Sequence, residues 1–83
     1  MEELDIVTLD NNKDYVIAKM LDYKGKKYFL LVEVDKDENL LDDKIILELN
    51  SINRSNELKT IDNNLTYKII SEKFAKLLLE DIK

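Results

Sequence analysis

Apolar runs of strand length, separated by short polar stretches, follow one another along most of the chain. The runs at residues 6–9, 14–23 and 26–34 are rich in Val, Ile, Leu and Tyr, which favour β-strands. Between the first two runs, Asp10–Lys13 carries Asp and Asn side chains that bond to the local backbone and favour turns. The pattern therefore predicts three consecutive strands joined by tight turns.

The second turn is marked by Lys24 and Gly25, the only glycine of the chain. Glycine adopts a positive φ without steric cost, as a two-residue hairpin turn requires. Counting outward predicts one nearly apolar face, with the pairs Tyr23 and Lys26, Leu21 and Tyr28, Ile17 and Val32, and Tyr15 and Val34. The other face then pairs Asp22 with Lys27, Met20 with Phe29, and Ala18 with Leu31. A three-residue loop with a bulge at Gly25 would mix the faces, so the pattern favours the two-residue turn.

The second half of the chain continues the sheet and then changes its period. Residues 44–52 alternate from Ile45 onward, which predicts a fourth strand. Residues 53–56 indicate a turn, and residues 57–61 indicate a short fifth strand. Asp62 has the short polar side chain of a helix N-cap. Beyond it, apolar side chains recur at helical spacing at Tyr67, Ile70, Phe74, Leu77, Leu78 and Ile82.

Together these elements predict an α+β fold: an antiparallel sheet of about five strands in meander order, with one C-terminal amphipathic helix packed on one face. The chain has no Pro, no repeat and no linker-like stretch, so residues 1–83 are expected to form a single small domain. A domain of this size buries only about three-fifths of the surface that its unfolded chain exposes. We therefore expect a small stability margin, or help from a partner.

The acidic stretch after the third run is a candidate metal site. Asp35, Asp37 and Asn39 alternate in it as the first ligands of a calcium loop do. A calcium loop also needs a glycine at its sixth place and a glutamate at its twelfth, where this chain has Leu40 and Ile46. Neither flank has a helical pattern. The stretch is therefore interpreted as a charged connection between strands, with no bound metal.

Charge and composition limit the binding partners and the cellular compartment that we expect for the protein. The net charge of −5 and the pI near 4.7 oppose contact with phosphate backbones, so no direct nucleic-acid binding is expected. The acidic N-terminus lacks the pattern of a secretory signal, and no apolar run is long enough to cross a bilayer. The absence of Cys is typical of a reducing compartment. We expect a cytoplasmic protein that contacts no membrane.

The absence of both His and Cys also limits the chemistry. It removes the usual general base near neutral pH, the commonest metal ligand and any thiolate nucleophile. One alternative is an enzyme in which Glu33, Asp35 and Asp37 hold magnesium on a phosphorylated substrate. Another is an acidic mimic of nucleic acid that occupies a basic protein site. The favoured hypothesis is a non-enzymatic protein without a cofactor.

The order of these features resembles a known family. The features are a hairpin ending in Tyr23-Lys24-Gly25-Lys26-Lys27-Tyr28, an acidic loop, the strand sequence Ile45-Ile46-Leu47, and Ile61-Asp62 before a helix. Over about residues 4–79 the chain is similar to the YrzB-like family of small acidic bacterial proteins, domain of unknown function 1292. The chain departs from it by being richer in Lys and Asn, less acidic and without Pro. The resemblance implies the same topology and brings no established activity or catalytic residue.

A single helix covers only one face of a five-stranded sheet, so the other face needs a different cover. The apolar residues expected on that other face form the candidate interaction surface: Ala18, Met20, Phe29, Leu31 and Ile46. Together with the acidic loop at residues 35–43, this face would bind an unidentified protein partner or mediate self-association. The alternative is that the sheet bends into a small barrel and buries these side chains.

Overall fold

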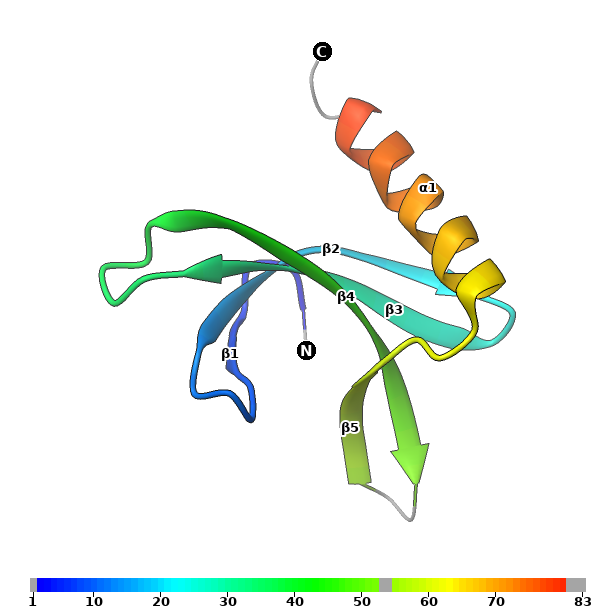
Figure 1. Ribbon diagram of the computed structural model, residues 1–83, viewed down its shortest axis with the longest axis horizontal. Helices are drawn as coiled ribbons and strands as arrows, with labels where there is room; N and C mark the ends of the chain where they lie inside the picture. The colour runs from blue at the N-terminus through cyan, green and yellow to red at the C-terminus, as the bar shows by residue number, and fades with distance from the viewer. Residues whose placement is uncertain (1, 53–54, 81–83) are drawn as a thin grey trace.

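The computed structural model describes residues 2–52 and 55–80, which form one sheet and one helix (Figure 1). The elements are β1 (Ile6–Thr8), β2 (Asp14–Tyr23), β3 (Lys26–Val34), β4 (Leu40–Ile52), β5 (Ser55–Thr60) and α1 (Asn64–Glu80). Neighbouring strands pair antiparallel in the order β1-β2-β3-β4-β5. The predicted α+β meander with a C-terminal helix is thereby confirmed. Two positions of the predicted turn, 53 and 54, and Ile82 of the predicted helical stripe lie outside the described residues.

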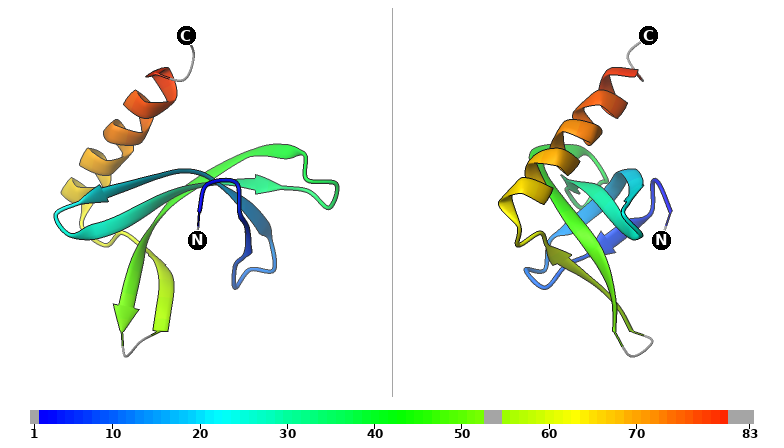
Figure 2. Two further views of the ribbon diagram at one scale, coloured as in Figure 1. Left: turned by 180° about the vertical axis from the view of Figure 1, so that it is seen from behind. Right: turned by 90° about the vertical axis from the view of Figure 1, so that its right-hand side faces the viewer.

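The sheet is strongly curled. Its central strands form an arch with α1 above the convex side, while β1 and β5 descend on the concave side (Figures 1 and 2). Because β1 and β5 are the two edges of the sheet, the curl turns the first and last strands toward the same concave space. This shape decides which apolar side chains are covered.

The β2–β3 hairpin has two registers separated by a β-bulge. On the turn side the pairs follow the prediction: Tyr23 with Lys26, Asp22 with Lys27, Leu21 with Tyr28, and Met20 with Phe29. The register then shifts between Ile17 and Lys19, which leaves Ala18 as the extra residue. The pairs predicted beyond this point are wrong: Ala18 with Leu31, Ile17 with Val32, and Tyr15 with Val34.

The turn between β2 and β3 has the predicted two residues. Lys24 and Gly25 have φ values of 49° and 80°. A turn with two positive φ values matches the right-handed twist of the strands that it joins. The next hairpin differs from the prediction, because β5 begins at Ser55 rather than at Glu57.

The connection between β3 and β4 is shorter than predicted, because β4 begins at Leu40 rather than at Lys44. Asp35 organises this loop. One carboxylate oxygen, Oδ1, accepts hydrogen bonds from the backbone N–H groups of Asp37 and Asn39, both at 2.9 Å. The other oxygen, Oδ2, accepts one from the Asn39 side-chain amide at 3.2 Å. The alternating Asp and Asn side chains therefore fold the loop itself.

The helix is capped by Asn63. Its side-chain Oδ1 accepts hydrogen bonds from the backbone N–H groups of Leu65 at 2.9 Å and Thr66 at 3.1 Å. These are two of the N–H groups that have no carbonyl partner inside a helix. The prediction of Asp62 as the N-cap is wrong by one residue. Asp62 and Asn63 both have a short polar side chain suited to capping, so the sequence alone does not distinguish them.

Two apolar clusters lie on opposite sides of the sheet. The cluster away from the helix has the buried residues Tyr15, Ile17, Phe29, Leu31 and Leu47. The cluster beneath the helix has the buried residues Tyr28, Leu30, Ile70 and Phe74, with Leu77 and Leu78 partly buried against them. Tyr67, predicted to belong to the buried stripe, is exposed. The sheet is therefore a layer with apolar side chains on both sides.

Candidate interaction groove between the edge strands

The five residues of the candidate interaction surface do not share one exposed face. Ala18 and Ile46 pack against the cluster beneath the helix, whereas Met20 packs against the cluster on the other side. Phe29 and Leu31 are 0% exposed. The prediction of a common exposed face is wrong because the bulge breaks the alternation of β2 and the curl of the sheet covers the concave cluster. The burial of Phe29 and Leu31 agrees better with the alternative in which the sheet bends and covers these side chains.

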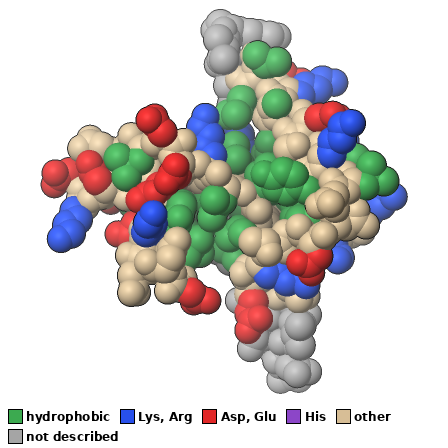
Figure 3. Space-filling model, in the orientation of Figure 1, with side chains coloured by type: hydrophobic (Ala, Val, Ile, Leu, Met, Phe, Trp, Pro, Cys, Tyr) green, Lys and Arg blue, Asp and Glu red, His purple; other side chains and the backbone are tan. Residues whose placement is uncertain are grey.

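The curl leaves an apolar groove open between β1 and β5. It has a volume of about 660 Å³ and is lined by Val7, Thr8, Leu9, Asp10, Asn11, Ile45, Leu47, Glu57, Leu58, Lys59 and Thr60. Figure 3 shows apolar side chains gathered in this hollow, with polar and charged side chains on both banks. Val7, Leu9, Ile45, Leu47 and Leu58 all belong to or pack against the concave cluster. The groove is therefore an uncovered part of the core.

Each wall of the groove is an edge strand. In an edge strand, alternate backbone N–H and C=O groups point away from the sheet and have no strand partner. Within residues 2–52 and 55–80, β1 pairs only with β2, and β5 pairs only with β4. The walls therefore offer backbone hydrogen-bonding groups beside an apolar floor. The sequence pattern does not predict the groove, because its walls are far apart in the sequence and face a common space only when the sheet curls.

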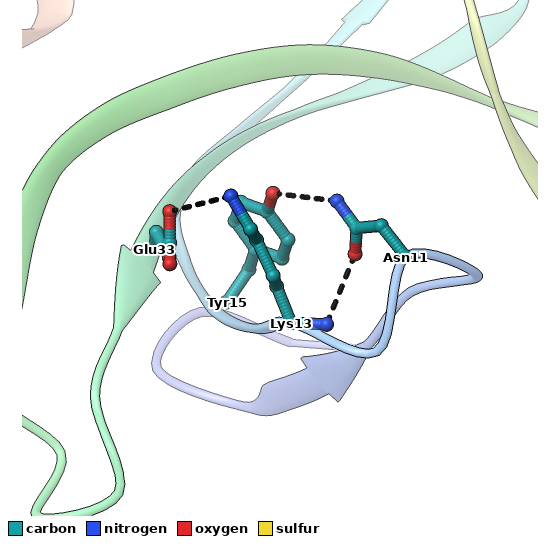
Figure 4. A network of polar contacts seen from close by, with 4 residues as sticks. All are labelled: Asn11, Lys13, Tyr15 and Glu33. Atoms are coloured by element: carbon teal, nitrogen blue, oxygen red, sulfur yellow. Dashed lines mark hydrogen bonds and ion pairs between the residues drawn. The ribbon is translucent and has the colours of Figure 1, made fainter.

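The turn between β1 and β2 is held by a local polar network (Figure 4). The Asn11 side-chain amide donates to the Tyr15 hydroxyl at 3.1 Å, and Asn11 Oδ1 accepts from the backbone N–H of Lys13 at 3.0 Å. The ammonium group of Lys13 lies 3.8 Å from a carboxylate oxygen of Glu33. Since Tyr15 is a buried core residue, these contacts tie the rim of the groove to the core.

The charges along the groove are mostly acidic. Asp10 and Glu57 line opposite walls, and Lys59 is the one cationic residue among the lining residues that the structure describes. The ammonium group of Lys59 lies 3.7 Å from a carboxylate oxygen of Glu48. Glu48 also pairs with the Lys26 ammonium, so its single negative charge is shared between two lysines. Among the described lining residues, the exposed carboxylates of Asp10 and Glu57 therefore outnumber the one ammonium group.

Glu48 is the centre of a separate polar site beside the start of α1. The residue is 7% exposed, and its carboxylate lies 3.9 Å from the Lys26 ammonium and 3.7 Å from that of Lys59. Burial, followed by the nearby Glu48 charge, raises the pKa of Tyr28 above its ordinary value of 10.0. A polar pocket of about 300 Å³ adjoins these groups. The arrangement neutralises a buried carboxylate, which is a structural task.

The charged groups of the acidic loop also interact mainly with the loop itself. Hydrogen bonds from the Asn39 backbone, with smaller contributions from its side chain and from Asp37, lower the pKa of Asp35 below 3.8. Among the residues that the structure describes, no group of three or more His, Cys, Asp or Glu side chains could hold a metal ion. Among the same described residues, no helix has the length and apolarity needed to span a membrane.

Comparison of the chain with protein-family models, with curated proteins and with solved structures finds no match.

Proposed function

We propose that the protein is a non-enzymatic protein-interaction module of the cytoplasm, and that the groove between β1 and β5 is its binding site. The observation that carries this proposal is the apolar groove of about 660 Å³ between two unpaired strand edges. An exposed apolar floor favours a partner because covering it removes apolar surface from water. The resemblance to the YrzB-like family stays a prediction; it supports only the non-enzymatic part of the proposal, because it brings no established activity.

Both components of the groove favour a polypeptide as the bound molecule. A free edge pairs with another backbone through N–H and C=O groups that recur along the strand. Leu58 on one wall and Val7 on the other offer apolar contacts for the side chains of that backbone. A small polar metabolite would leave the apolar floor uncovered, so the same groove gives it little to bind.

The metal and nucleic-acid-mimic alternatives find less support. Glu33 pairs with Lys13, and Asp35 uses both carboxylate oxygens to hold its own loop. A mimic of nucleic acid needs a continuous row of acidic groups. Here Lys26 and Lys59 flank the buried Glu48. Self-association through the groove remains the second candidate, since a second copy also offers free strand edges.

The proposal is tested by selecting binders from a displayed library of random peptides. Wild type is expected to enrich a defined set of sequences. Leu58→Asp, which places a charge on the apolar wall, and Thr60→Lys, at an exposed position of the same wall, are expected to lose that set. Leu65→Asp is the matched control, because Leu65 is an exposed apolar residue on the helix.

Thermal unfolding of each variant verifies that it is folded before selection. Two results would overturn the proposal: wild type enriches no peptide, or the enriched peptides bind Leu58→Asp and Thr60→Lys as well as they bind wild type. Loss of binding in Leu65→Asp alone would place the site on the helix instead.

A further inference from the structure

We infer that the partner is an extended segment of another protein and that this segment adds as a strand to the β5 edge. The segment is rich in Lys or Arg. This inference rests on the proposed function. The segment lies antiparallel to β5 and directs alternate apolar side chains into the groove. Three properties of the groove lead to this inference: the direction of its walls, the spacing of its floor and the sign of its charge.

The direction of the walls follows from the meander. Every neighbouring pair in the sheet is antiparallel, so the first and last of the five strands run in the same direction. If β1 and β5 closed on each other, they would have to pair in parallel, which is slightly less stable per residue. A single added strand that is antiparallel to β5 is antiparallel to β1 as well. The sheet is therefore suited to receive one strand between its edges.

The β5 edge is the better of the two for this pairing. It has six residues, compared with three in β1. Glu57, Leu58, Lys59 and Thr60 are consecutive in β5, and all four line the groove. An added strand can therefore follow the edge and the groove together.

The floor of the groove selects the side chains of the added strand. Side chains of a strand alternate between its two faces, so every second residue of the segment meets the floor at Leu47, with Leu58 and Val7 on the two walls beside it. Branched apolar residues are favoured at these positions, both for strand propensity and for burial. The intervening residues face away from the floor and are free to be polar.

The charge of the groove selects a cationic partner over a second copy of this chain. Asp10 and Glu57 lie on opposite walls and outnumber Lys59, whose ammonium group already lies against Glu48. A second copy carries a net charge of −5 and brings the same two carboxylates to the contact. Like charges across an interface disfavour association, whereas Lys or Arg beside the two carboxylates favour it.

The test uses synthetic peptides of about eight residues. The first peptide alternates Val with Lys, the second alternates Val with Glu, and the third has the first sequence with alternate backbone amides methylated. Amide shifts of the protein in NMR spectra locate the binding, and sedimentation measures the mass of the protein alone.

The lysine peptide is expected to shift amides of β5 and β1, and the glutamate peptide is expected to bind much more weakly. The methylated peptide is expected not to bind, since methylation removes the N–H donors of a strand ladder. Glu57→Lys is expected to lower the affinity for the lysine peptide by about threefold to tenfold. The control Glu72→Lys, an exposed acid on the helix, is expected to leave its binding unchanged. The attraction weakens further as salt is added.

Several results would overturn the inference. Equal binding of the lysine and glutamate peptides contradicts the charge selection, and binding of the methylated peptide contradicts strand addition. Shifts confined to α1 contradict the location. Absence of peptide binding, together with a concentration-dependent mass that Leu58→Asp abolishes, assigns the groove to a second copy. That last outcome leaves the groove as an interaction site, whereas failure of the library selection removes the proposed function itself.

Discussion

Ile17 of β2 pairs with Leu31 of β3, one residue away from the partner that the Lys24-Gly25 turn would give it without a bulge. The shift places Tyr15 and Ile17 in the same buried cluster as Phe29 and Leu31. The extra residue, Ala18, therefore determines which side chains of β2 reach the concave core.

Deletion of Ala18 tests this role. Without the extra residue, a continuous register would turn Tyr15 and Ile17 away from their cluster, or would leave β2 paired over a shorter length. The expected loss of unfolding free energy is at least about 3 kcal/mol, as measured by urea denaturation. Ala18→Gly keeps the residue count and is expected to cost about 1 kcal/mol or less. A deletion variant as stable as wild type would contradict the account of the bulge.

Gly25→Ala tests the hairpin turn. Gly25 has a φ of 80°, and an added Cβ would meet no other atom within 4 Å. The cost is therefore expected to come from the backbone alone, at about 1–2 kcal/mol. Chemical denaturation measures it, with Gly25→Asn as the control, because Asn tolerates a left-handed conformation better than Ala. Equal losses in the two variants would show that a side chain at this position is the problem, rather than its φ.

Asp35 is expected to titrate below its ordinary pKa of 3.8. Because its pKa is lower in the folded chain than in the unfolded chain, its contribution to stability is present above the unfolded pKa and is lost as pH falls through the folded pKa. NMR titration of the side-chain carboxyl carbons measures this midpoint directly. Asn39→Ala removes the side-chain amide that donates to Asp35 and is expected to raise the midpoint toward 3.8. No change in Asn39→Ala would mean that the backbone hydrogen bonds alone hold the pKa down.

Glu48 and its two lysines are expected to respond unequally to mutation. Removing the positive charges with Lys26→Met and Lys59→Met together leaves a buried carboxylate uncompensated, at an expected cost of about 2 kcal/mol. Glu48→Gln leaves two lysines that are half-exposed and well hydrated, at an expected cost of about 1 kcal/mol. Urea denaturation at neutral pH compares the two. A larger loss in Glu48→Gln would contradict the view that the lysines serve to neutralise the carboxylate.

The strand order, the two-residue turn and the helix follow from local signals in the sequence. Gly25 marks the turn, and the change of period after Ile61 marks the helix. The bulge at Ala18 gives no such signal. Phe29, Leu30, Leu31 and Val32 form an unbroken apolar run, so a shift of one residue still sets apolar side chains opposite β2. The pattern therefore does not distinguish the two registers.

The groove could not be predicted for a different reason. Val7 and Leu58 are far apart in the sequence, and each is one of several apolar residues in a short strand. They line a common space because the sheet curls and brings its two edges to the concave side. Exposure of Phe29 and Leu31 would require a nearly flat sheet, and the hydrophobic pattern does not encode the curvature that buries them.

Hydrogen exchange of the protein with and without a selected peptide tests the central claim most directly, that the groove between the two sheet edges binds a polypeptide. The expected result is slower exchange of backbone amides in β5 and β1 when the peptide is bound, with the amides of α1 unchanged. Slower exchange in α1 alone, or no change in either edge strand while the peptide is bound, would contradict the claim.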